Sequence, residues 1–192
     1  MHPSKAVLSL VGVVTLGVGT VAFAGSDRGG HDEPGKRQHR FASTTLADAG
    51  GERVGRVWFE QHRRDGSVTV VARVWGLPPG FHGFHVHTVG KCEPPAFTSA
   101  GGHFNPTGAS HGDHAGDLPT LLVNEDGTGM LAATTDRFSI SDLRDADGSA
   151  VMVHELPDNY ANIPARYAPQ GPDAETRATG DAGSRLACGA LR

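Results

Sequence analysis

The stretch from Gly102 to Asp117 holds the residues best suited to chemistry, three histidines and two aspartates among Gly, Pro, Asn and Ser. Gly and Pro interrupt regular structure, and Asn and Ser favour turns, so the stretch should form a loop. Imidazole is the commonest metal ligand and suits both zinc and copper. A solvated surface loop with incidental histidines is the simpler alternative. As a site, the stretch offers four ligands to one tetrahedral ion: His103, His111, His114 and Asp117.

Three more histidines occur in strand-like segments. His85 and His87 alternate in an apolar run, so in a strand they would face the same side, about 6.6 Å apart. His154 ends the apolar run Val151–Val153, which should be a buried strand that reaches the surface there. A lone pair of this kind is weak support for a metal, and one histidine at a strand end is usually structural. Three separate histidine groups in one domain together indicate a metal centre.

The elements that would position these groups are short strands separated by turns. Apolar and β-branched runs alternate with Gly, Pro, Asn and Asp, and no 3.6-residue periodicity extends over ten positions after residue 24. This pattern predicts an all-β fold, an antiparallel barrel or sandwich of eight strands with two long loops, residues 102–117 and 158–183. Trp58, Trp75 and the Val and Leu positions should form its core. The expected strands are 42–49, 53–62, 68–75, 81–89, 118–123, 129–135, 150–154 and 185–190.

The chain of 192 residues divides into a leader, a linker and one domain, residues 41–192. Residues 1–24 carry Lys5, an apolar run and an A-x-A site, which is typical of a secretory signal peptide and predicts a secreted or extracytoplasmic protein of the cell envelope. An uncleaved leader would instead anchor the protein to a membrane. Residues 25–40 are rich in Gly and charge and predict a disordered linker, whose His31 and His39 are read as solvated rather than metal-gathering.

Charge and cysteine content narrow the function classes. The formal net charge is −4 and no basic run occurs, so nothing favours nucleic-acid binding. The only two cysteines are Cys92 and Cys188. Behind a secretory signal such a pair indicates a disulfide, whereas in a cytosolic protein it would more often stay reduced.

Five motifs, spread over the chain from about Phe41 to its C-terminus, resemble those of secreted bacterial copper/zinc superoxide dismutases. The resemblance implies a Greek-key β-barrel, copper and zinc as cofactors, and the superoxide anion as substrate. The motifs are Gly83-Phe84-His85-Val86-His87, Gly102-His103-Phe104-Asn105-Pro106, His114-Ala115-Gly116-Asp117-Leu118, Val153-His154-Glu155 and Gly180-Asp181-Ala182-Gly183-Ser184-Arg185-Leu186-Ala187-Cys188-Gly189.

Carried over by position, the resemblance implies two metal sites that share one ligand, with His103 bridging the metals as an imidazolate. Four nitrogens in a near-square arrangement suit Cu(II), whereas three imidazoles and a carboxylate in a tetrahedron suit Zn(II). The implied copper ligands are His85, His87, His103 and His154, and the implied zinc ligands are His103, His111, His114 and Asp117.

The resemblance also implies roles for residues around the metals. Asp158 would accept hydrogen bonds from one copper-side and one zinc-side histidine, Arg185 would attract and orient the anion, and Thr179 would narrow its channel. In the implied reaction copper takes an electron from one superoxide and gives one to a second, while His103 delivers a proton. The products are oxygen and hydrogen peroxide.

Two other functions are compatible with such a domain. A non-catalytic copper or zinc carrier on the same fold would not need Asp158 and Arg185 in their family positions, yet both are present. A secreted zinc hydrolase could use Glu155 as its base, but the complete set of copper-side histidines leaves no obvious open zinc position. His62 and His82 match no ligand position and are read as structural or solvated.

The main departure from the family lies in the segment that carries the implied zinc ligands His111, His114 and Asp117. Only two residues separate His111 from His114, whereas many relatives have a longer segment there. The glycines Gly112 and Gly116 would permit the tight turns required, so zinc is expected beside copper. A copper-only enzyme is the alternative. A homodimer is compatible with the family, but no segment identifies its interface.

Overall fold

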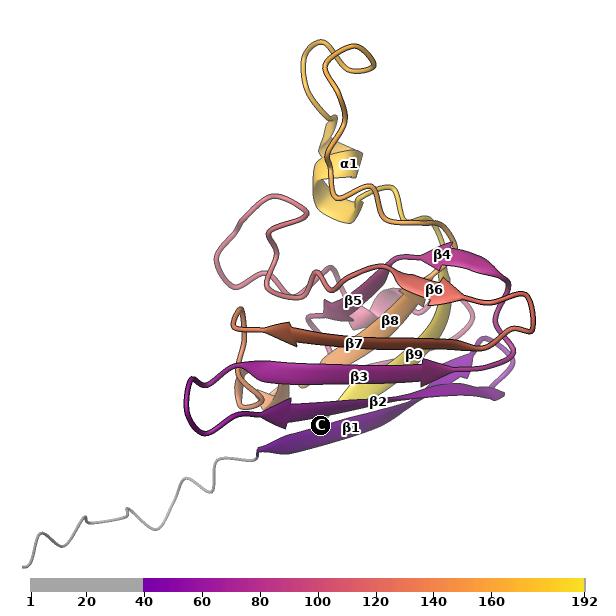
Figure 1. The fold of residues 1–192 in the computed structure, drawn as a ribbon, viewed down its shortest axis with the longest axis vertical. Helices are drawn as coiled ribbons and strands as arrows, with labels where there is room; N and C mark the ends of the chain where they lie inside the picture. Colours follow the sequence, from indigo (N-terminus) through magenta and orange to yellow (C-terminus); the bar gives the residue numbers. More distant parts are fainter. Residues whose placement is uncertain (1–39, 192) are drawn as a thin grey trace, which may run out of the picture. The chain divides into compact units, whose positions relative to one another are not determined.

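A computed structural model describes residues 40–191 of the chain, so the predicted signal peptide and all of the predicted linker except Arg40 lie outside the described residues. Nine antiparallel strands form one sheet in the order β4-β6-β7-β3-β2-β1-β9-β8-β5, which curls into a nearly closed barrel (Figure 1). The all-β prediction is confirmed. The strands are β1 (Phe41–Asp48), β2 (Arg53–Gln61), β3 (Val68–Val74), β4 (Gly80–His82), β5 (Phe84–His87), β6 (Leu121–Val123), β7 (Gly129–Thr135), β8 (Ser149–His154) and β9 (Arg185–Leu191).

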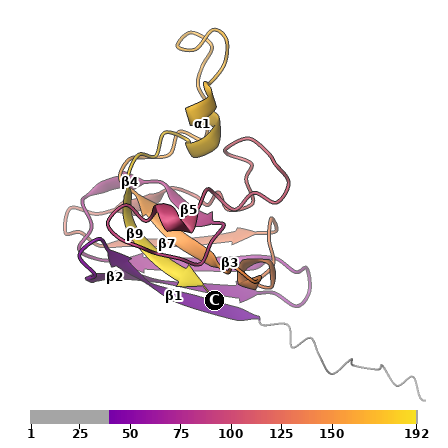
Figure 2. The same cartoon turned by 180° about the vertical axis from the view of Figure 1, so that it is seen from behind.

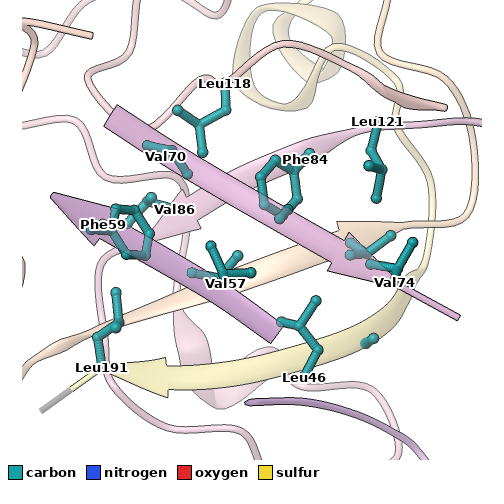
Figure 3. Close-up of a cluster of buried hydrophobic side chains, with 14 of the residues drawn as sticks. Leu46, Val57, Phe59, Val70, Val74, Phe84, Val86, Leu118, Leu121 and Leu191 are labelled. Atoms are coloured by element: carbon teal, nitrogen blue, oxygen red, sulfur yellow. The ribbon is translucent and has the colours of Figure 1, made fainter. Parts of the chain in front are cut away.

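The core follows from the alternation of apolar residues along the strands. Leu46, Val57, Phe59, Val70 and Phe84 are completely or almost completely buried, and they come from strands on both sides of the barrel (Figure 3). Burial of this apolar surface is the main favourable term in folding. In β5, Phe84 and Val86 point into this core, which leaves the other face of the strand for the two histidines between and after them.

The prediction that both tryptophans lie in the core is wrong. Trp58 lies between Val57 and Phe59, whose side chains point inward, so its own side chain points outward and is 37% exposed. Trp75 follows the last residue of β3 and is 44% exposed, and its indole Nε1 donates to the Arg53 carbonyl at 2.7 Å. At both positions the alternation of inward and outward side chains, rather than hydrophobicity, decides that the tryptophan faces outward.

The predicted count of eight strands is also wrong, because one expected strand changes partner part-way. β4 pairs with β6, whereas β5 pairs with β8, and Gly83 separates the two. A side chain at Gly83 would have its Cβ 2.7 Å from the Ala182 Cβ, so the chain needs glycine at the crossing. The expected strand from Leu118 begins only at Leu121, after Pro119.

Both long loops lie at the same end of the barrel in the two opposite views (Figures 1 and 2). The second contains a six-residue helix, α1 (Ala174–Thr179), that the sequence pattern did not reveal. The Asp173 carboxylate caps its start by accepting from the Thr176 N–H at 2.9 Å, and Gly180 ends it in the left-handed conformation. Two short 3₁₀ helices, η1 (Thr98–Ala100) and η2 (Asp142–Arg144), complete the elements. Among the described residues, no helix has the length and apolar character needed to cross a membrane.

A disulfide joins Cys92, in the segment after β5, to Cys188 on β9, with the two Cα atoms 5.6 Å apart. The predicted pairing is confirmed. It links the segment before the first long loop to the last strand, across 96 residues of chain.

Candidate metal centre

Four buried histidines converge at one end of the barrel from three different segments. His85 and His87 lie on β5, His154 ends the neighbouring strand β8, and His103 faces His87 through an isolated β-bridge. One ring nitrogen from each histidine lies within 4.8 Å of one ring nitrogen from every other. Sheet pairing therefore brings together all four residues for which the sequence predicts copper ligation.

Backbone carbonyls fix two of these rings. The Nδ1 of His87 donates to the Gly101 carbonyl at 2.9 Å, and the Nδ1 of His154 donates to the Gly183 carbonyl at 3.1 Å. With Nδ1 protonated in both neutral rings, each Nε2 is an electron-pair donor. The two Nε2 atoms lie 3.3 Å apart and face the same space. Two unprotonated nitrogens at this distance form an arrangement that a metal cation would stabilise.

A second group of ligands forms around the carboxylate of Asp117. Its Oδ1 lies 2.9 Å from the His103 Nδ1 and 3.3 Å from the His114 Nδ1, and its Oδ2 lies 3.3 Å from the His111 Nδ1. Residues 111–117, hereafter the zinc loop, wrap this carboxylate. Despite its few residues, the zinc loop brings together the four side chains that the sequence predicts as zinc ligands, and His103 belongs to both groups.

Asp158 links the two groups. Its Oδ2 lies 2.7 Å from the His85 Nε2 and its Oδ1 lies 2.7 Å from the His111 Nε2. Both histidines thus place their protons on Nε2, as predicted for this aspartate. The Nδ1 atoms of both histidines are buried: that of His85 makes no hydrogen bond, whereas that of His111 faces the Asp117 Oδ2 at 3.3 Å. A buried ring nitrogen without a partner is unfavourable, and the His85 Nδ1 belongs to the cluster where a metal would satisfy it.

Burial keeps His85, His87 and His154 neutral. It lowers the pKa of His85 to about 4, although the hydrogen bond to Asp158 works against this shift. Burial likewise lowers the pKa of His154 to about 3 and holds the pKa of His87 well below its usual value. Neutral imidazole is the form that binds metals, so no proton has to be displaced at neutral pH.

The zinc side is electrostatically different. Burial opposes the charge on His111, but the carboxylates of Asp117 and Asp158 outweigh it and raise the pKa of His111 to about 9. Burial would raise the pKa of either carboxyl, yet the hydrogen bonds from the histidines hold the pKa values of Asp117 and Asp158 far below their usual value. In the absence of metal, a proton on His111 therefore balances part of this buried negative charge.

A hollow of about 530 Å³ opens onto the four-histidine group. Arg185 lines it beside His87, His103 and His154, and Thr179 lies on its wall. The Arg185 guanidinium donates from Nη1 to the Phe97 carbonyl at 2.5 Å and from Nη2 to the Gly101 carbonyl at 2.7 Å. The structure thus brings both predicted channel residues to the same hollow as the histidines.

Sequence reasoning missed the residues that act through their backbone. The carbonyls of Gly101 and Gly183 orient His87 and His154. Every residue has a backbone carbonyl, so the residue type does not reveal this role. The role of Gly180 was not predicted either, because it depends on the space around the residue. A Cβ at this position would overlap Asp158 Oδ1 and His111 Nε2. His82 is buried between the carbonyls of His154 and Pro78, which agrees with a structural role.

Comparison with known proteins decides between the families that such a site could serve. Residues 53–191 match the model of the family described as copper/zinc superoxide dismutase (SODC). The chain belongs to the copper/zinc superoxide dismutase family. Members of this family use copper and zinc, and the two histidine groups are where this chain could bind them.

Named relatives agree with the family assignment. The superoxide dismutase [Cu-Zn] of Mycobacterium tuberculosis is 39% identical over 199 residues, which cover 95% of this chain and 82% of the relative. That of Mycolicibacterium paratuberculosis is 42% identical over 165 residues, covering 78% and 73%. Both matches extend over most of each protein.

Solved structures of the family fold resemble this one. A superoxide dismutase-like protein from Bacillus subtilis aligns with a TM-score of 0.63 at 33% identity, covering 78% of this chain and 97% of that one. The clock protein EA4 aligns with a TM-score of 0.67 at 33% identity, covering 82% and 96%. The fold therefore also carries proteins whose names state no dismutase activity.

Proposed function

We propose that this protein dismutates superoxide to oxygen and hydrogen peroxide at a copper site joined to a zinc site through His103. The observation that carries the proposal is the sharing of His103 by the two ligand groups, with Arg185 in the hollow beside one of them. The proposed copper ligands are His85, His87, His103 and His154, and the proposed zinc ligands are His103, His111, His114 and Asp117.

The residues present fit these two metals. Four imidazoles suit copper, and three imidazoles with a carboxylate suit zinc. The unpartnered Nδ1 of His85 and the facing Nε2 atoms of His87 and His154 are positions that a bound metal would satisfy. Asp158 supports the same assignment. It binds the Nε2 of His85 and the Nε2 of His111, so the Nδ1 of His85 is directed toward the copper group and the Nδ1 of His111 toward the zinc group.

Copper, when bound, supplies the one-electron chemistry by which two superoxide anions and two protons become one oxygen and one hydrogen peroxide. The protein's part begins with Arg185, whose cation attracts the anion into the hollow and orients it beside the histidines. Thr179 narrows that hollow. The Nδ1 of His103 faces Asp117, so its Nε2 is the atom that can hold and deliver a proton.

The alternatives are a non-catalytic extracytoplasmic copper/zinc-binding protein and a zinc hydrolase. A carrier has no use for a fixed guanidinium at the mouth of its metal site, so the position of Arg185 favours the enzyme. Among the described residues, Glu155 is exposed and does not line the hollow beside the histidines, which argues against its use as the base of a hydrolase.

We also propose an extracytoplasmic location. The Cys92–Cys188 disulfide supports it, since disulfides persist in oxidising compartments. The signal peptide over residues 1–24, the linker over residues 25–40 and a homodimer stay predictions.

The decisive experiment combines metal analysis with a superoxide-decay assay on protein matured with both metals. Near-equal copper and zinc per chain and rapid decay are expected. A His87→Ala variant should lose activity together with copper, because this residue belongs only to the copper group. Metal-loaded protein without dismutase activity would favour the carrier, and full copper with negligible zinc would favour a copper-only enzyme.

A further inference from the structure

The zinc loop is braced from outside by a residue that is not a ligand. Arg137, two residues after β7, donates from Nη1 to the Gly112 carbonyl at 3.0 Å and to the His114 carbonyl at 3.2 Å. Its Nη2 lies 3.4 Å from the Asp113 Oδ1. All three contacts fall on residues 112–114, the turn that leads from one zinc-loop histidine to the other. We infer that Arg137 is a positioning residue that holds the zinc loop in its ligand-presenting shape.

The same two loop residues bind the ligand carboxylate on the opposite side. The Gly112 N–H donates to the Asp117 Oδ2 at 2.7 Å, and the His114 N–H donates to the same oxygen at 3.1 Å. Gly112 and His114 therefore direct their N–H groups inward to Asp117 and their carbonyls outward to Arg137. Arg137 therefore fixes the peptide unit that follows each of these residues, directly next to the units whose N–H groups hold the carboxylate.

The brace starts from a rigid part of the molecule. Phe138, the next residue, is 4% exposed and packs edge-on against Phe59 with ring centroids 6.3 Å apart. The Arg137 N–H donates to the Thr135 Oγ1 at 3.2 Å, at the end of β7. Tyr160 confines the loop from another direction, because its carbonyl lies 2.8 Å from where a Gly112 Cβ would be. Contacts from the end of β7 and from the second long loop thereby add to the zinc loop's own hydrogen bonds.

Charge alone predicts the opposite effect, which makes the inference testable. A guanidinium beside a cation site repels the cation, so electrostatics by itself would make zinc bind more tightly when Arg137 is removed. Positioning predicts weaker binding. Loss of outer partners of metal ligands commonly lowers metal affinity about 10- to 100-fold, and Arg137 should lie near the lower end because its side chain is 40% exposed.

The test measures zinc affinity by competition with a chromophoric chelator and amide hydrogen exchange in the metal-free protein. Arg137→Ala should weaken zinc binding about tenfold, leave copper affinity within about twofold, and speed exchange of the zinc-loop amides. Arg137→Lys, which keeps the charge but loses the forked donor, should fall between it and wild type. Asp113→Ala should change little, because an ion pair with an 82% exposed carboxylate contributes little.

Arg73→Ala is the matched control, since Arg73 is an exposed arginine on β3, where it pairs in register with Arg56 and Met130. It removes the same charge without touching the zinc loop and should leave both readouts at the wild-type value. The inference rests on the proposed zinc ligands, but amide exchange needs no metal. Unchanged exchange in Arg137→Ala overturns it even if the wild type binds no zinc. Unchanged or tighter zinc binding in that variant also overturns it.

Discussion

Arg185 keeps its charge available because carbonyls, rather than carboxylates, hold it in place. Both of its terminal nitrogens donate to backbone oxygens, of Phe97 and Gly101, and no carboxylate of the described residues forms an ion pair with it. Burial lowers its pKa from a very high value, and an arginine remains a cation all the same. The hollow above the histidines is therefore lined by a fixed cation beside the metal ligands, with Glu175 and Asp181 also on its wall.

Arg185→Glu should lower the superoxide rate by about 10- to 1,000-fold, a range known for electrostatically steered enzymes, superoxide dismutases included. Copper content should be unchanged, since Arg185 belongs to neither ligand group. Stopped-flow decay of superoxide measures the rate, and raising the ionic strength should slow the wild type. Arg73→Glu carries the same charge change on the outer face of β3 and should retain the wild-type rate. Equal rates in all three proteins would remove Arg185 from the mechanism.

Gly180 shows how one missing side chain can shape both sites. It has a φ of 63°, and a Cβ would overlap atoms of Asp158 and His111. Gly180→Ala should push these groups apart and lower retention of both metals at least tenfold, as judged by metal content after dialysis against a chelator. Gly171→Ala is the matched control, because Gly171 also has a positive φ, 84°, but its Cβ would meet only the Arg177 Nη2, at 3.4 Å. Equal metal loss in the two variants would show that backbone strain, rather than the overlap, is responsible.

At the scale of elements, the disulfide fixes the segment that carries the partners of Arg185. Cys92 begins this segment, which includes η1 and ends at Gly101, and Cys188 ties it to the strand that Arg185 begins. The covalent bond and the two guanidinium contacts thus join the same two elements. Loss of the bond should affect both stability and rate.

Replacing both cysteines by serine should lower the free energy of unfolding by about 4–5 kcal/mol, because the bond closes a long loop in the unfolded chain. Urea denaturation of both proteins measures the difference. The superoxide rate should fall as well, since the carbonyls of Phe97 and Gly101 lose their anchor, while copper content stays the same. A loss of less than about 1 kcal/mol would contradict the loop-entropy argument.

The sequence predicted most elements, and its failures have physical causes. The alternation of apolar and polar residues located the barrel strands. It could not show that Trp58 faces outward, because three apolar residues in a row do not reveal which of them point into the core. The partner change at Gly83 depends on pairings with segments distant in the chain. α1 is too short to leave a periodic pattern and depends on its caps. Site residues were predictable because side-chain chemistry and motif position identify them, whereas Arg137 looked like any surface cation.

At the scale of the whole domain, the metal-free protein should be most stable near pH 6.5–7. The folded-state pKa values of His85 and His154 lie at about 4 and 3, below the ordinary 6.5, so the unfolded chain binds more protons and stability falls as pH drops below about 6.5. His111 acts in the opposite direction. Its pKa of about 9 means that the folded state holds the extra proton, and stability falls as pH rises from about 6.5 to 9.

Thermal unfolding of the metal-free protein between pH 4 and pH 10 would measure this maximum. His111→Ala should remove the alkaline decline and retain the acid one, since only His111 among these histidines has a raised pKa. A stability that is flat from pH 6.5 to 9 in the wild type would contradict the assignment of a proton to His111.

The change of partner at Gly83 has a consequence for how the protein avoids sticking to other chains. β4 and β5 are the two outermost strands of the sheet, yet they are consecutive in the chain, so Gly83 alone connects one edge to the other. They contain three and four residues, and the Gly83 N–H and carbonyl are already bonded, to the Leu156 carbonyl and the His154 N–H. Exposed sheet edges are templates on which further chains can add as strands and aggregate. Here the outer edge of β5 is already bonded to the first long loop, through Gly116 and Phe104, and β4 is short, which leaves little backbone for such growth.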